Sequence, residues 1–183
     1  MITRLLWLLS VAKVHIRMEG TMEMTANAMD LAQNQPKHLD QFVLGSRLSE
    51  MERLPVWVDS LAAAYSIDEN IKFAINLCLE EVVSNVIRHG YANQEGQFLT
   101  VDCNSPRPGQ FVFTVEDDAA PFNPLELAAL PGISPQDEGQ IGGQGIRLLR
   151  GFSDTLEYEP KPGGNRLRIG FTNASAGPSN WPQ

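Results

Sequence analysis

The longest amphipathic helix pattern in the chain constrains the fold most strongly, because it predicts a single helix that must pack one face against a core. The pattern opens where Ser66 and Glu69 stand at capping-box spacing, and Gly90 supplies its stop. Its apolar residues recur at steps of three and four, which predicts a buried stripe: Ile71, Ile75, Cys78, Val82 and Val86.

Two polar residues on one border of this stripe carry side chains that could take part in catalysis or metal binding. Glu81 and Asn85 lie four residues apart and share a helix face, whereas Glu80 points to the opposite, solvated side. A carboxylate there could accept a proton, and an amide oxygen is a hard ligand suited to Mg²⁺. Taken alone, the pair also fits the polar border of any amphipathic helix. His89 falls in the apolar stripe near the helix end, where a hydrogen-bonded structural histidine is expected.

Alternating apolar residues predict strands on either side of this helix. A first helix should open at Ser49 and Glu52, another capping-box pair, and run towards Tyr65. A last helix should follow the glycines that precede Ile146. We therefore expect an α+β fold, a two-layer sandwich with helices on one face of a mixed, mostly antiparallel sheet. The first expected strand ends at Gly45. Four more are expected around residues 99–103, 111–115, 155–159 and 166–171.

Two turns add candidate binding groups. Asp117 ends a buried-looking strand, where its carboxylate could accept a hydrogen bond from an adenine amino group or simply start a turn. Gly143 and Gly145 precede a helix, so backbone amides could face phosphates there, or the glycines form a plain connection. The connection between these turns is long and holds four prolines, which is typical of a functional or mobile segment.

Length, charge and cysteine usage limit the kinds of protein that this chain can be. The 183 residues suit one domain, and a net charge of -8 argues against a nucleic-acid-binding surface. Cys78 and Cys103 make no disulfide framework, so both are expected to be small core residues of a cytoplasmic protein.

The N-terminal apolar run at residues 5–9 is too short to span a bilayer. A signal peptide is one interpretation of it. We favour a misassigned or disordered start, with Met18, Met22 or Met24 as the true first residue. The expected organisation is a flexible or misassigned segment (1–36), one domain (37–173) and a disordered tail (174–183).

The ordered set of motifs resembles the GHKL ATPase superfamily, which has the Bergerat ATP-binding fold, and within it the bacterial anti-sigma-factor serine/threonine protein kinases. The resemblance spans about residues 38–172. Four segments carry it. They are Glu81-x-x-x-Asn85 followed by His89-Gly90, Asp117 through Pro121-Phe122-Asn123-Pro124, Gly143-x-Gly145 before an aliphatic helix, and Gly163-Gly164-Asn165-Arg166-Leu167, which resembles the turn before the family's last strand.

The resemblance implies a binding site for ATP and Mg²⁺. Glu81 would be the catalytic base and Asn85 the Mg²⁺ ligand, while Leu125 to Gly142 would form a lid over the nucleotide. One residue departs from the pattern, because Ala119 occupies a glycine position. An alanine there would be strained if φ must be positive, but a methyl could fit if only close approach is needed. The implied nucleotide-binding residues are Asn85, His89, Asp117, Ala119, Gly143, Gly145 and Ile146.

The resemblance further implies an ATP-dependent kinase that phosphorylates a small antagonist (anti-anti-sigma) protein and sequesters a sigma factor or similar target. A homodimer through the first strand and helix would fit, with Arg53 as a partner contact or a merely solvated charge. No direct contact with nucleic acid or a membrane is expected. The alternative is a nucleotide-gated binding module without significant kinase activity. A histidine kinase domain is disfavoured, because no dimerisation hairpin with a phosphoacceptor histidine precedes residue 38.

Overall fold

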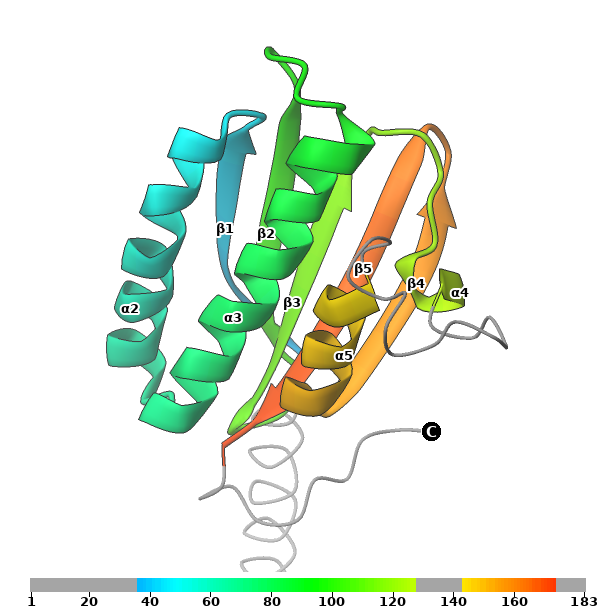
Figure 1. The fold of residues 1–183 in the computed structure, drawn as a ribbon. Helices are drawn as coiled ribbons and strands as arrows, with labels where there is room; N and C mark the ends of the chain where they lie inside the picture. The colour runs from blue at the N-terminus through cyan, green and yellow to red at the C-terminus, as the bar shows by residue number, and fades with distance from the viewer. Residues whose placement is uncertain (1–35, 128–142, 174–183) are drawn as a thin grey trace, which may run out of the picture. The chain divides into compact units, whose positions relative to one another are not determined.

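Helices cover one face of a five-stranded sheet in the computed structural model, which describes residues 36–127 and 143–173 (Figure 1). The expectations for the N-terminal segment (1–35), for most of the lid (128–142) and for the tail (174–183) concern residues outside this described part. In the described ranges, no helix has the length and apolar character needed to cross a membrane.

The sheet is antiparallel throughout its described strands, so the expectation of a mixed sheet was wrong in that respect. Hydrogen bonding orders the strands β1-β2-β3-β5-β4. The third and fourth strands run in the same direction, but the last hairpin places β5 between them, so no parallel pair forms. The strands are β1 (Lys37–Gly45), β2 (Phe98–Ser105), β3 (Gln110–Asp117), β4 (Thr155–Lys161) and β5 (Gly164–Thr172).

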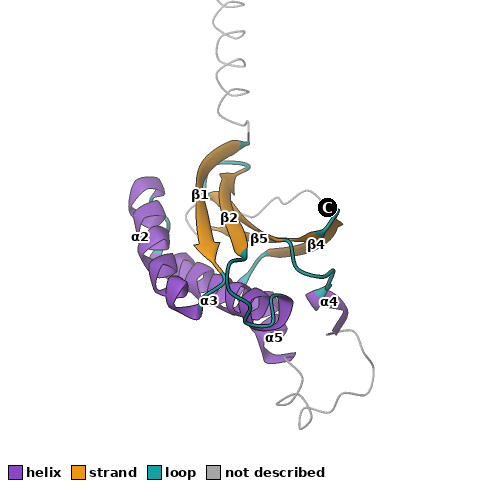
Figure 2. Ribbon diagram, turned by 90° about the horizontal axis from the view of Figure 1, so that it is seen from above, coloured by secondary structure: helices purple, strands orange, loops and turns teal. Residues whose placement is uncertain are grey.

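The helices form the second layer, and the view from above shows α2, α3 and α5 on the same side of the sheet (Figure 2). This confirms the expected α+β sandwich. The longest helix, α3, continues into a single π turn before it stops at Gly90. The helical segments are η1 (Leu48–Glu52), α2 (Arg53–Tyr65), α3 (Glu69–Asn85), η2 (Val86–Gly90), α4 (Pro124–Leu127) and α5 (Gly143–Phe152).

A chain of aromatic contacts joins the two layers. Phe42 of β1 stacks on Trp57 of α2 with ring centroids 5.3 Å apart. Trp57 meets Phe113 of β3 edge to face at 6.0 Å, and Phe113 meets Phe171 of β5 at 5.9 Å. Burying such large rings is among the strongest stabilising contributions in a core. The aromatic chain therefore ties the first helix to three strands.

Both cysteines are core residues, as expected. Cys78 on α3 and Cys103 on β2 are fully buried and unpaired with each other. Burial raises the pKa of each thiol to about 12, because a thiolate would be poorly solvated there. They remain neutral thiols at physiological pH and fill space.

Both predicted capping boxes are wrong. Ser49 lies inside η1, and Ser66 adopts a left-handed conformation (φ 54°) that ends α2. Helix α3 begins after Asp68, whose backbone N–H donates to Asn173 Oδ1 at 3.1 Å. The same amide donates through Nδ2 to the Ser66 carbonyl oxygen at 2.9 Å. A side chain from the end of β5 thus satisfies groups that a local cap would have satisfied.

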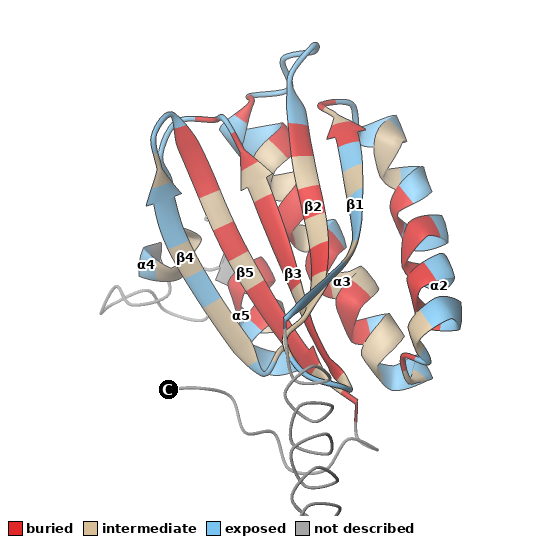
Figure 3. Ribbon diagram, turned by 180° about the vertical axis from the view of Figure 1, so that it is seen from behind, coloured by how far each residue is buried: buried red, intermediate tan, exposed pale blue. Residues whose placement is uncertain are grey.

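The face of the sheet away from the helices carries a row of ion pairs across β3, β5 and β4 (Figure 3 shows this face). Glu116 contacts Arg166 Nε at 2.5 Å and Lys161 Nζ at 3.2 Å. Arg166 also reaches Glu159, which in turn pairs with Arg168. Burial acts to raise the pKa of Glu116, but hydrogen bonds from Arg166 and Lys161 outweigh it and hold that pKa below its usual range.

The depressed pKa of Glu116 predicts a stabilisation that is lost in acid. A carboxyl whose folded-state pKa lies below its unfolded value stabilises the fold above the unfolded pKa, and loses this effect as pH falls through the folded-state pKa. Glu116→Gln should lower the free energy of unfolding by about 1 kcal/mol or less at pH 7, since the pair is only partly buried. Urea unfolding should show this loss shrinking as the pH falls through the folded-state pKa of Glu116, which lies below the ordinary glutamate value. Glu157→Gln, an exposed position on β4, is the control. A loss in Glu116→Gln that does not shrink in acid would contradict the assignment.

Candidate functional site

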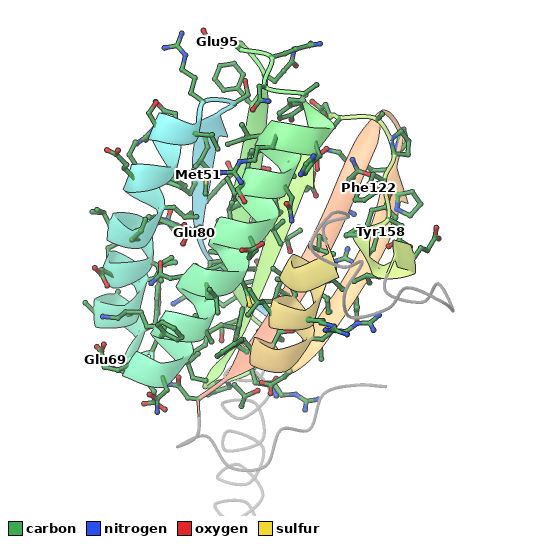
Figure 4. All side chains as sticks on the ribbon, viewed as in Figure 1. Met51, Glu69, Glu80, Glu95, Phe122 and Tyr158 are labelled. Atoms are coloured by element: carbon green, nitrogen blue, oxygen red, sulfur yellow. The ribbon has the colours of Figure 1, made fainter. Side chains whose placement is uncertain are left out.

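The polar border of α3 faces α5, as the helix phase predicted. Glu81 and Asn85 are half-buried on this border. Glu80, which Figure 4 labels, is exposed on the solvated side of the same helix. The buried stripe beside them includes Cys78 and Val82, whose side chains fix the rotation of α3 on the sheet. The sequence therefore identified correctly which of the two adjacent glutamates lies against the rest of the protein.

A glycine brings α5 against this border. A Cβ atom built on Gly145 would lie 2.7 Å from Glu81 Oε2 and 3.5 Å from Asn85 Nδ2. The first distance is shorter than real Cβ contacts, so no larger residue fits while the carboxylate stays in place. The structure thus brings together three of the predicted residues. They are the carboxylate of Glu81, the amide of Asn85 and Gly145 in the first turn of α5.

The first turn of α5 supplies backbone N–H groups that have no partner within the helix. Gly143 begins this helix. The side chain of Ile146 is 3 % exposed and belongs to the hydrophobic core, so only its backbone is available to a ligand. A helix N-terminus that holds a glycine next to a carboxylate and an amide suits a phosphate group accompanied by a cation.

His89 lies away from the buried stripe, contrary to expectation. The residues from Val86 to Gly90 form a π turn, and the Tyr91 N–H bonds to the Val86 carbonyl at 2.8 Å. A π turn holds more residues than an α turn, so it changes the phase of the residues that follow. As a result His89 is exposed, and a role in a binding site remains a prediction.

Asp117 occupies the end of β3 and is 5 % exposed. Its Oδ1 accepts hydrogen bonds from the Ala119 backbone N–H at 2.9 Å and from Asn165 Nδ2 at 2.8 Å. A Cβ atom on Gly164 would overlap the Asp117 carbonyl group, so the glycine of the neighbouring strand is required for this close approach. The carboxylate is therefore held from both sides, through one of its two oxygens.

Ala119 fits its position without backbone strain. Positive φ angles among the described non-glycine residues occur only at Ser66, Ala92 and Asn93, so Ala119 does not have one. Its side chain is buried, and a Cβ on Gly90 would lie 3.0 Å from the Ala119 methyl. The missing side chain of Gly90 leaves room for this methyl, so alanine is accommodated at residue 119 without a positive φ.

Tyr91 joins the end of α3 to the turn after β3, a connection that the sequence did not reveal. Its hydroxyl donates to the Phe98 carbonyl at 2.7 Å and accepts from the Asp118 backbone N–H at 3.2 Å. Burial raises the pKa of Tyr91 above its ordinary value, so the hydroxyl stays protonated and keeps donating. The only hint was its place directly after the His89-Gly90 pair.

The donor set fits a shared cation better than a dedicated metal cage. The described residues contain no group of three or more His, Cys, Asp and Glu side chains that could hold a metal ion. Mg²⁺ is commonly held by one or two protein oxygens and completes its octahedron with waters and substrate phosphates. Asn85, with Glu81 one turn away, offers the first part of such a shell.

Known proteins share this combination of sequence and fold. The profile of the histidine kinase-like ATPase domain matches residues 44–171. Serine/threonine-protein kinase BtrW of Bordetella bronchiseptica is 24% identical over 113 residues, which make up 62% of this chain and 79% of BtrW. An anti-sigma F factor of Clostridium kluyveri is 29% identical over 94 residues, which make up 51% of this chain and 65% of that protein.

A solved structure supports the fold independently. In the SiaB-SiaC complex from Pseudomonas aeruginosa, the matching chain has a TM-score of 0.57 at 15% sequence identity. The superposition covers 84% of this chain and 99% of that chain. At this identity the likeness concerns the fold alone.

The close approach at Gly145 can be tested with a matched pair of substitutions on α5. In Gly145→Ala the new methyl would meet Glu81 Oε2, which sits at the end of a flexible side chain, so the fold should survive while the carboxylate moves. We expect the affinity for Mg²⁺-ATP, measured by titration calorimetry, to fall about tenfold. Gly151→Ala adds a methyl with nothing within 4 Å. It should leave the affinity unchanged and stabilise the helix by about 0.5–1 kcal/mol; equal affinities in both variants would contradict the proposed geometry.

Proposed function

Because this chain belongs to the histidine kinase-like ATPase domain family, which is of the GHKL type, we propose that it is an ATP-dependent serine/threonine protein kinase of the anti-sigma-factor class. The observation that carries the proposal is the convergence of Glu81, Asn85 and Gly145 at the first turn of α5. Such a kinase would act in the cytoplasm on a small antagonist protein and would sequester a sigma factor or a similar target.

The proposed nucleotide lies between α3 and α5, with its base towards the end of β3. Asp117 accepts a hydrogen bond from the adenine amino group, and the backbone at Gly143 and Gly145 lies along the phosphates. Asn85 would hold Mg²⁺, which would supply positive charge to neutralise the phosphates. His89 and the proposed lid are also assigned to nucleotide binding, but the proposal does not depend on either of them.

Glu81 is the proposed catalytic base. The hydroxyl oxygen of the substrate serine or threonine forms a bond to the γ-phosphorus, and the bond from that phosphorus to the β–γ bridging oxygen breaks. The hydroxyl proton passes to the Glu81 carboxylate, and ADP leaves with the bridging oxygen. Half-burial of Glu81 beside a helix N-terminus keeps the carboxylate close to the phosphates without removing it from the reach of a substrate.

The proposed partners rest on the family resemblance, and the relatives' names support them only in part. BtrW is named as a serine/threonine-protein kinase and the clostridial protein as an anti-sigma F factor. We assign to this chain a protein substrate of the anti-anti-sigma kind and a sigma factor or similar target. A homodimer through β1 and α2 is part of the same proposal. Arg53 was a candidate contact with a partner protein. Its side chain already pairs with Glu50 and lies over the Phe42 ring, which weakens that role.

The alternative is a binding module of the same fold without kinase activity. The glycine-to-alanine departure at Ala119 favoured it slightly, but this residue fits beside Gly90 without a positive φ. The two functions differ in one measurable respect, because a module would bind ATP but would transfer no phosphate to any partner.

Two adjacent glutamates give a matched test of the catalytic base. With [γ-³²P]ATP and a purified protein of the anti-anti-sigma kind that the wild-type chain phosphorylates, Glu81→Gln should reduce the rate of phosphoprotein formation by about 10²–10⁴-fold. Glu80→Gln, on the exposed side of the same helix, should keep the wild-type rate. Calorimetry should show that both variants still bind ATP. Equal labelling by the Glu81 variant would refute the assigned base.

A further inference from the structure

Asn165, at the start of β5, makes an unusually complete set of hydrogen bonds for a residue that no motif assigned to the site. It is 8 % exposed and pairs in register with Asp117 on β3. Its Nδ2 donates to Asp117 Oδ1 at 2.8 Å and lies near two backbone carbonyl oxygens, those of Ala120 (3.2 Å) and Ala119 (3.4 Å). Its Oδ1 accepts from the Phe122 N–H and the Tyr158 hydroxyl, both at 2.8 Å.

These partners fix the orientation of the Asn165 amide. The Phe122 backbone N–H can only donate, so the atom facing it is the oxygen. The carbonyl of Ala120 can only accept, so the atom facing it is the nitrogen. Both acceptor positions of Oδ1 and both hydrogens of Nδ2 are therefore in use. Asn165 has no hydrogen-bonding capacity left for a ligand, and any effect it has on binding must pass through its neighbours.

The neighbour that matters is Asp117. Its Oδ1 accepts from Asn165 and from the Ala119 N–H, which together fix the rotation of the carboxylate. Both of these bonds go to Oδ1, and among the described residues none donates a hydrogen bond to Oδ2, so this second oxygen is available as an acceptor. A lone acceptor with a fixed direction matches the 6-amino group of adenine. The 6-oxo group of hypoxanthine is itself an acceptor, so it could form no hydrogen bond with Oδ2 and the two oxygens would repel each other.

The same side chain also holds the segment that leads away from the site. Its bonds to residues 119, 120 and 122 fix the turn between β3 and α4, and Tyr158 braces the amide from β4. Figure 4 shows Phe122 and Tyr158 on the same side of the domain, next to β4 and β5. The direction of the free Asp117 oxygen and the path of this turn are thus set by one residue.

We infer that Asn165 is a positioning residue that sets the selectivity of the site for adenine over 6-oxopurines, by holding Asp117 so that only Oδ2 faces the base. The inference rests on the proposed nucleotide-binding function. It assigns to Asn165 a role in discrimination between bases, which is separate from its contribution to folding.

The test compares ATP with ITP, which differs from it at the purine 6-position, where an oxo group replaces the amino group. Calorimetric titration in the presence of Mg²⁺ should show that the wild-type protein prefers ATP. In Asn165→Ala the affinity for ATP should fall about tenfold while that for ITP stays within about twofold, so the ATP-to-ITP ratio should collapse. A role limited to folding would lower both affinities together and leave the ratio unchanged.

Asn173 provides a control of the same residue type and similar burial. It is 6 % exposed and bonds to Asp68 and Ser66 at the start of α3, away from Asp117. Asn173→Ala should reduce stability without changing the ATP-to-ITP ratio. If Asn165→Ala fails to fold, Tyr158→Phe removes one donor to the Asn165 amide and should lower the ratio in the same direction, by about two- to threefold.

The outcomes separate the inference from the function beneath it. A folded wild-type protein that binds neither nucleotide would overturn the proposed function and, with it, this role. A wild-type protein that binds ATP and ITP equally, or an Asn165 variant with an unchanged ratio, would overturn the inference and leave the kinase proposal standing.

Discussion

The absence of a side chain at Gly145 is the condition on which the candidate site depends. It lets the first turn of α5 lie directly against Glu81 and Asn85, so that backbone N–H groups, a carboxylate and an amide face the same space. A sheet with helices on one face provides the rigid base for this contact, because the buried stripe of α3 fixes the rotation of the helix. The polar border then points towards α5 rather than to solvent.

The opposite end of the site is organised by contacts between strands rather than between helices. Pairing of β3 with β5 sets Asn165 opposite Asp117, and Gly164 permits the close approach of the two backbones. Tyr91 and Gly90 connect this end to the close of α3, through the Asp118 amide and the Ala119 methyl. Residues distant in sequence are thereby held as one unit that spans both layers.

Local patterns predicted what depends on local geometry. Alternation located the strands, and helix phase distinguished Glu81 from Glu80, because each depends only on neighbours within a few residues. Predictions failed where a distant partner or an irregular turn intervened. The capping box at the start of α3 was wrong because Asn173 bonds there from the end of β5, and His89 was misplaced because periodicity does not reveal a π turn. The sequence placed Asn165 only in the turn before the last strand, and its contact with Asp117 was not predicted because Asp117 belongs to another strand.

The insertion of β5 between β3 and β4 has a consequence for how the protein is made. A chain leaves the ribosome N-terminus first, so the residues of α3 emerge well before those of β5. The hydrogen bond from Asn165 to Asp117 cannot form until Asn165 has been synthesised and its strand has entered the sheet next to β3. A nascent or C-terminally truncated chain would therefore leave Asp117 without this partner, however well its helices had formed.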